Sequence, residues 1–166
     1  MEHMITLRSA ITKTALVLLL AATTTAQAGG AGQIFGGLGF PPGAASSASR
    51  GVSADGSVVV GDGGPAFGGI GFRWTRSGGM ANLGTLPGGT YSFVAGVSGN
   101  GLVISGYGDS TDGQRAYRWT SAGGMENLGV LPGGIQSLGG PLSADGSVIV
   151  CTSGSAGGYR AARWTA

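Results

Sequence analysis

One tripeptide recurs at a constant interval, and this repetition constrains the fold more than any other feature. Arg-Trp-Thr stands at 73–75, 118–120 and 163–165, so the three tryptophans are 45 residues apart. Other landmarks keep the interval without a gap: Leu-Gly at 38, 83 and 128, Pro-Gly at 42, 87 and 132, and serine at 53, 98 and 143. A period near 45 residues is typical of propeller blades or repeat arrays. We therefore expect three copies of one supersecondary unit.

Each copy carries the signals of four short strands in two hairpins. In the first copy an Asp-Gly turn at 54–56 precedes a β-branched run at 57–60, and Phe72 and Trp74 alternate in the next strand. A turn at 77–79 leads to a further strand at 80–84. Gly and Pro number 37 and 6 of 166 residues, which, with a period, favours a turn-rich β fold over disorder. The sequence predicts an all-β, β-propeller-type array of three four-stranded blades.

The repeats run over about residues 38–82, 83–127 and 128–166. The last copy ends before its fourth strand, and residues 35–39 resemble the missing segment. We predict that residues 35–39 form the strand that completes the last blade. Three blades are fewer than the four to eight of closed propellers, so a homo-oligomer that completes a ring is expected. A β-trefoil is the alternative fold, because it also has twelve strands in three units.

The first 28 residues have the pattern of a secretory signal peptide. Arg8 and Lys13 precede an apolar run at 15–22, and Ala26-Gln27-Ala28 is a small-x-small cleavage site. The run is short for a membrane span, which takes about 20 residues. The expected mature domain is 29–166, secreted to the cell exterior or the periplasm, without stable membrane insertion after cleavage.

The repeats resemble the HAF-repeat family of bacterial extracellular proteins over about residues 35–166. The resemblance lies in the segments 51–61, 72–75, 78–80 and 83–89. It implies a secreted or envelope-associated protein with a propeller-like fold and names no activity. The family's His-Ala-Phe triplet reads Ile-Gly-Phe at 70–72, Arg-Ala-Tyr at 115–117 and Arg-Ala-Ala at 160–162, so no role of that histidine carries over.

The residue types present after position 28 argue against most kinds of catalytic and metal site. This part of the chain lacks Lys and His, which excludes the common nucleophile schemes and the common zinc sites. Seven arginines and six acids leave a net charge of +1 without a basic cluster, so we expect no nucleic-acid partner. We predict no enzyme activity, no cofactor and no metal, and interpret Asp109–Gly113 as a polar turn and Cys151 as a small buried residue.

The most variable parts of the repeats are predicted loops at 62–70, 107–115 and 152–160. A constant frame with divergent loops is typical of a recognition scaffold. The candidate binding residues are Phe67, Tyr107, Asp109, Asp112 and Tyr159. A second set is expected to be structural, with tryptophan packed between blades and arginine either over it or paired with a turn aspartate: Arg73, Arg118, Arg163, Trp74, Trp119 and Trp164.

The resulting hypothesis is a secreted, non-catalytic binding or structural module for a surface glycan or protein. One alternative is an extracellular polysaccharide hydrolase that uses carboxylates among Asp62, Asp109, Asp112 and Glu126. Another is a truncated fragment of a longer HAF-repeat protein.

Overall fold

The computed structural model describes residues 35–64 and 69–166. The chain divides into two units, Met1–Phe35 and Gly36–Ala166, and the account below concerns the second. The predicted signal peptide and the candidate Phe67 lie outside the described residues. The described residues contain no apolar helix of membrane-spanning length.

The described residues form eleven β-strands. They are β1 (Ser47–Val52), β2 (Val58–Gly63), β3 (Ile70–Thr75), β4 (Gly79–Asn82), β5 (Ser92–Val97), β6 (Val103–Gly108), β7 (Arg115–Thr120), β8 (Gly124–Asn127), β9 (Ser137–Leu142), β10 (Val148–Ser155) and β11 (Gly158–Thr165).

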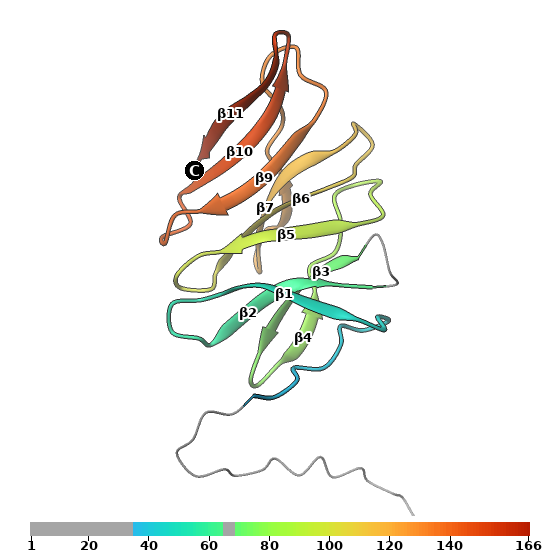
Figure 1. Cartoon of the computed structure of the whole chain (residues 1–166), viewed down its shortest axis with the longest axis vertical. Coiled ribbons are helices and arrows are strands. Elements are labelled where there is room, and N and C mark those ends of the chain that lie inside the picture. Colours follow the sequence, from blue (N-terminus) through green and yellow to red (C-terminus); the bar gives the residue numbers. More distant parts are fainter. Residues whose placement is uncertain (1–34, 65–68) are drawn as a thin grey trace, which may run out of the picture. The chain divides into compact units, whose positions relative to one another are not determined.

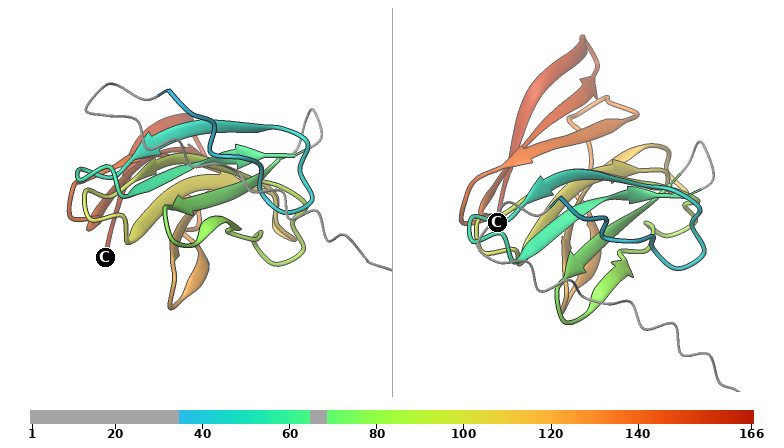
Figure 2. Two further views of the ribbon diagram at one scale, coloured as in Figure 1. Left: turned by 90° about the horizontal axis from the view of Figure 1, so that it is seen from below. Right: turned by 60° about the horizontal axis from the view of Figure 1, so that its bottom comes forward.

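Each repeat forms its own antiparallel meander (Figure 1). The sheets are β1-β2-β3-β4, β5-β6-β7-β8 and β9-β10-β11, and Figure 2 shows them from two further directions. This confirms the prediction of propeller-type blades. The β-trefoil alternative is wrong, because a trefoil would pair strands of different repeats within one barrel.

Within the described residues of a single chain, the predicted twelfth strand is absent. Residues 35–39 form no strand, and the sheet of the third repeat has three strands with β11 at its edge. The strands that match the front segment are β4 and β8, which pair with β3 and β7. A strand needs such a neighbour for its backbone groups, and within the described unit residues 36–39 have none.

A serine-centred turn joins the first two strands of every blade. In the first copy Ser53 Oγ donates to Asp55 and accepts the amide of Val58 at 3.0 Å. Gly56 in this turn has a φ of 71°, which glycine adopts at little cost. The other copies repeat these contacts with Ser98 and Asn100 and with Ser143 and Asp145.

Successive blades pack face to face through their strand residues. We call the face of a blade that points to the next repeat its forward face and the opposite one its backward face. Forward-facing Val58 and Val60 and backward-facing Ile104 share one core cluster with Leu83 and Val94. The first strand of each later blade lies on the blade before it, since β5 contacts β1, β2 and β3, and β9 contacts β5, β6 and β7.

Buried serines add hydrogen bonds between the blades. Ser92 Oγ accepts the amide of Gly71 at 2.9 Å and donates to the carbonyl of Gly84 at 2.7 Å. In the next interface Ser137 Oγ accepts the amide of Ala116 at 2.9 Å and donates to Gly129 at 2.6 Å. Both serines are buried and make the same two hydrogen bonds, so the two blade interfaces share one polar contact.

Candidate functional site

The predicted variable loops are shorter than expected, because the strands extend into them. Tyr107 lies in β6 and Tyr159 in β11, while Asp109 and Asp112 lie in the turn between β6 and β7. The structure therefore does not gather these candidates into one loop cluster. Tyr159 is 63% exposed near the tip of the third blade, where its hydroxyl contacts Gln136.

Asp109 is engaged in holding the chain rather than in presenting a free carboxylate. It accepts the amides of Thr90 and Tyr91 at 2.7 and 2.9 Å and the hydroxyl of Thr90 at 2.7 Å. Burial alone would raise the pKa of Asp109, but the hydrogen bonds from Tyr91 and Thr90 outweigh it and lower the pKa. Asp109 thus fastens the segment before β5 to the end of β6.

Asp112 is exposed in the same turn, and its amide is hydrogen-bonded to Ser110 Oγ at 3.2 Å. Among the described residues, no group of three or more His, Cys, Asp or Glu side chains is placed to hold a metal ion. The interpretation of Asp109–Gly113 as a polar turn agrees with these contacts.

Three aromatic rings line one side of the second blade. The ring centroids of Tyr91 and Phe93 are 5.4 Å apart, as are those of Phe93 and Tyr107. Phe93 and Tyr107 are direct partners across β5 and β6, and Gln114 Nε2 donates to the Tyr91 hydroxyl at 2.8 Å. We call Tyr91, Phe93, Tyr107 and Gln114 the aromatic cluster.

The aromatic cluster belongs to the second repeat alone. The matching ring positions are Ser46, Ala48 and Asp62 in the first repeat and Gln136, Leu138 and Thr152 in the third. All three rings remain partly exposed. All three repeats form blades although only the second has rings at these positions, so the rings are not required for blade formation.

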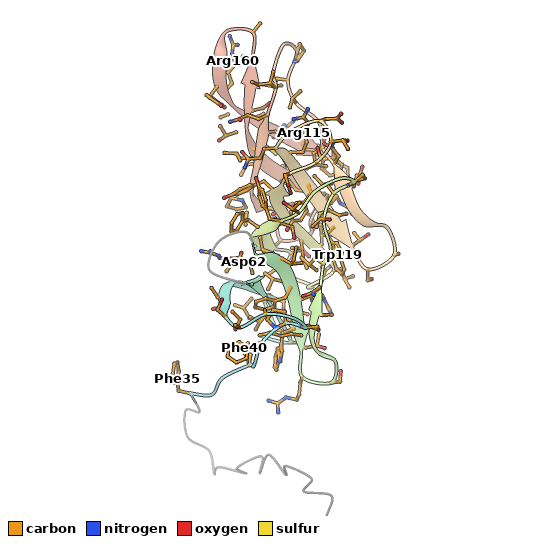
Figure 3. All side chains as sticks on the ribbon, turned by 90° about the vertical axis from the view of Figure 1, so that its right-hand side faces the viewer. Phe35, Phe40, Asp62, Arg115, Trp119 and Arg160 are labelled. Carbon is orange, nitrogen blue, oxygen red and sulfur yellow. The ribbon has the colours of Figure 1, made fainter. Side chains whose placement is uncertain are left out.

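A partly buried ion pair lies beside this cluster, at the interface of the first two blades. Arg50 Nη2 is 2.9 Å from Asp62 Oδ2, and Asp62 Oδ1 accepts the amide of Val94 at 3.3 Å. Asp62 is nearly buried on the first sheet (Figure 3). The hydrogen bond and charge of Asp62 raise the pKa of Arg50 against the opposing effect of burial, and Tyr107 adds a smaller effect in the same direction.

Tyr117 is the other polar group near Asp62. Burial, and secondarily the negative charge of Asp62, raise the pKa of Tyr117 far above its usual range. Its hydroxyl has no hydrogen-bond partner among the described residues. The phenol is therefore neutral and acts as a core ring, not as a base.

Sequence reasoning missed Arg50, Tyr91, Phe93 and Gln114. The spacing of Tyr91 and Phe93, two residues apart at the start of β5, is that of side chains on one face of a strand and could have marked them. Their contact with Tyr107 depends on the register of β5 and β6, which cannot be read from the sequence.

Four of the six repeated arginines and tryptophans make contacts between blades. Trp119, on the second sheet (Figure 3), packs against the core cluster formed with the first blade. The guanidinium carbon of Arg118 is 5.8 Å from the ring centroid of Trp164 in the third blade. Arg73 Nε donates to the carbonyl of Gly101 at 3.4 Å, whereas Arg163 is exposed. Trp74 lines an open groove of about 540 Å³.

A small cavity of about 100 Å³ lies between the second and third blades. Its lining includes Cys151, Ala162, Trp164 and Ser137. Cys151 is half-buried, and this burial raises the pKa of its thiol. The thiol is thus a poor nucleophile at neutral pH.

Two solved structures have a fold similar to that of this chain. TolB from Acinetobacter baumannii is 18% identical with a TM-score of 0.55, over 74% of this chain and 30% of that chain. The putative TolB from Agrobacterium tumefaciens is 15% identical with a TM-score of 0.54, over 72% of this chain and 46% of that chain. This chain thus spans less than half of either protein.

No family model matches the chain, and no curated protein matches it. At identities this low, the likeness to the TolB structures concerns the fold alone. Together with the three meander sheets, it establishes that the repeats are β-propeller-type blades.

Proposed function

We propose that this chain is a non-catalytic binding module that acts outside the cytoplasm, as a member of the HAF-repeat family, and that it binds a surface glycan at the aromatic cluster. The observation that carries the proposal is the row of rings from Tyr91 through Phe93 to Tyr107, since the first and third repeats form blades without it. The signal-peptide pattern in residues 1–28 supports export to the periplasm or the cell exterior.

The chemistry of the cluster suits a flat ligand with both apolar and polar faces. Tyrosine offers an apolar ring with a hydroxyl at its tip, and such groups are frequent at binding surfaces. The amide of Gln114 adds a donor and an acceptor beside the Tyr91 hydroxyl. A saccharide ring presents C–H faces and hydroxyl edges in the same way.

The interactions of the carboxylates of Asp62 and Asp109 agree with a non-catalytic role. The carboxylate of Asp62 is paired with Arg50, and that of Asp109 accepts three hydrogen bonds from Thr90 and Tyr91. A glycosidase would need one protonated acid and one free carboxylate flanking the substrate. Neither Asp62 nor Asp109 is arranged for that task.

The test is a binding screen of the purified protein against an array of bacterial surface oligosaccharides, followed by calorimetric titration of the best binder. Tyr107→Ala and Phe93→Ala should each weaken binding at least tenfold. Tyr159→Ala is the matched control, because it removes an exposed tyrosine from the third blade, and it should leave affinity unchanged. Binding that is insensitive to Tyr107→Ala and Phe93→Ala would refute the site, and a protein ligand captured through the same rings would replace the glycan.

A further inference from the structure

The two blade interfaces within the chain are built from one set of hydrogen bonds, repeated at an offset of 45 residues. Besides the serine bonds described above, the amides of Ser92 and Ser137 donate to the carbonyls of Gly69 and Gln114 at 3.1 and 3.0 Å. At the turns, the amide of Ala54 donates to Gly99 at 2.9 Å, and that of Gly99 donates to Ala144 at 2.7 Å. The contact set is therefore a property of the repeat.

The first blade carries one half of this set without a partner blade. Ser47 holds the place of Ser92 and Ser137, and its Oγ already donates to Gly39 at 2.8 Å as theirs do to Gly84 and Gly129. Yet Ser47 is exposed, whereas Ser92 and Ser137 are 0% and 1% exposed.

Apolar side chains around Ser47 show the same difference. Leu38 is 38% exposed, although Leu83 at the matching position is 7% exposed. Val52 is 57% exposed, while Val97 packs against the core cluster. The backward side of the first blade thus presents the surface that the later blades bury.

The forward face of the third blade carries the other half of this set of interface contacts. Ala161 holds the place of Gly71 and Ala116, whose amides bind the interface serines, but Ala161 is exposed while Ala116 is 0% exposed. Val150 is 49% exposed, whereas Val60 and Ser105 at the same position are fully buried. The outer edge of β11 is also unpaired within its sheet.

From these two half-sets we infer that a second copy of this chain docks head to tail, with its first blade on the forward face of the third blade. Applying the repeat offset of 45 residues to the two existing interfaces gives the hydrogen bonds expected in the new one. The amide of Ala161 would donate to Ser47 Oγ of the second copy, the amide of Ser47 to the carbonyl of Tyr159, and the amide of Ala144 to the carbonyl of Ala54.

The same docking places a strand on the free edge of β11. In the second blade β8 pairs with β7, with Arg118 opposite Glu126 and Tyr117 opposite Asn127. Shifted by the repeat, Gly36 and Gly37 of the second copy lie opposite Arg163 and Ala162. Leu38 then extends this ladder through its amide to the carbonyl of Ala161, as Leu128 does to Ala116 at 3.0 Å.

Charge and aromatic groups match across the same surface. Arg118 lies over Trp164 at the interface of the second and third blades. The corresponding pair in the new interface is Arg163 over Trp74 of the second copy. Arg163 is exposed, and Trp74 faces an open groove, so both are accessible to a partner.

A second copy is the occupant because the complementary half-set is present on the chain itself. The two surfaces differ, so the contact is heterologous and leads to a ring or to an open filament. Two copies supply six blades, within the four to eight that close a propeller. The inference is thus a two-chain ring with two identical interfaces.

Disulfide trapping between two differently tagged versions of the protein tests the orientation. Both carry Cys151→Ser, one carries Ser47→Cys and the other Ala161→Cys. Oxidation of the mixture should link the two tags, whereas either version alone should stay unlinked. Linking of Ser47→Cys chains to each other, or an absence of linking in the mixture, would overturn the head-to-tail contact.

Light scattering after size exclusion tests the ring. The unmodified protein should have twice the monomer mass, and Ala161→Arg should have the monomer mass with an unchanged circular dichroism spectrum. Ser121→Arg adds the same charge on an exposed turn of the second blade and should remain a dimer. A monomeric unmodified protein, or a mass that grows steadily with concentration, would overturn the two-chain ring.

Discussion

Cys151 and Ala162 are direct cross-strand partners in the third blade, and they reverse the sizes found at that position in the other two. The matching pairs are Gly61 with Phe72 and Gly106 with Tyr117. A Cβ on Gly106 would lie 2.7 Å from Cζ of Tyr117 and 1.9 Å from the carbonyl oxygen of Phe93, so the ring and the neighbouring backbone both require glycine there. Alanine at 162 removes the ring that a side chain at 151 would otherwise meet.

This size relationship predicts strong coupling between the two positions. Ala162→Phe alone should destabilise the protein by about 1–3 kcal/mol, because the ring meets the Cys151 side chain. Adding Cys151→Gly should remove that penalty, since the pair then matches the first blade and fills the cavity of about 100 Å³. Urea unfolding of the two single variants and the double variant measures the coupling. Additive changes in the free energy of unfolding would contradict this packing account.

The turn carboxylates predict an acid-dependent loss of stability. Hydrogen bonds from Ser143 and then Ser147 hold the pKa of Asp145 at about 2, below its ordinary value of 3.8. The stabilisation is therefore present above pH 3.8 and is lost as the pH falls through 2. Asp145→Asn should keep the turn, because Asn100 makes the same contacts in the second blade, and should reduce the acid sensitivity.

Unfolding midpoints measured from pH 5 to below pH 2 test this prediction, together with an NMR titration of Asp145. Asn100→Asp is the reciprocal variant and should add acid sensitivity. An ordinary pKa for Asp145 in the folded protein would show that the Ser143 contact is absent in solution.

The Arg50–Asp62 pair predicts a rescue by a second substitution. Asp62 is 7% exposed and Arg50 49% exposed at the side chain. Arg50→Ala leaves a nearly buried carboxylate with only the Val94 amide, and should cost about 1–3 kcal/mol. Adding Asp62→Thr should recover most of this loss, because the third blade has Thr152 and Gly140 at these positions. Chemical denaturation decides the matter, and a double variant no more stable than Arg50→Ala would refute the argument.

The contact of Arg118 with Trp164 predicts a difference between two charge removals. Arg118→Gln should lower the free energy of unfolding by about 0.5–1 kcal/mol through loss of the cation–π contact. The carboxylate of Glu126 lies 3.9 Å from Arg118 and its side chain is 56% exposed, so Glu126→Gln should have almost no effect. Equal losses in the two variants would assign the effect to the ion pair instead.

Sequence reasoning predicted the candidate site less well than the fold. The sequence predicts Tyr107 in a loop, but it is a strand residue whose ring contacts Phe93. The sequence predicts Asp109 as a binding residue, but its carboxylate accepts hydrogen bonds from Thr90 and Tyr91. Both outcomes depend on contacts between residues 14 to 19 positions apart, and such contacts follow from register and packing.

The amino-acid sequence by itself determined the three blades, their strands and their turns, because these features have local causes. A glycine that accepts positive φ, as at Gly56, permits a tight turn between two strands, and the constant interval between tryptophans repeats the unit. Only the tertiary structure decided which surfaces are used. Ser92 and Ser47 occupy the same place in their repeats, yet one is buried and the other exposed, because burial depends on whether another blade is packed against the residue.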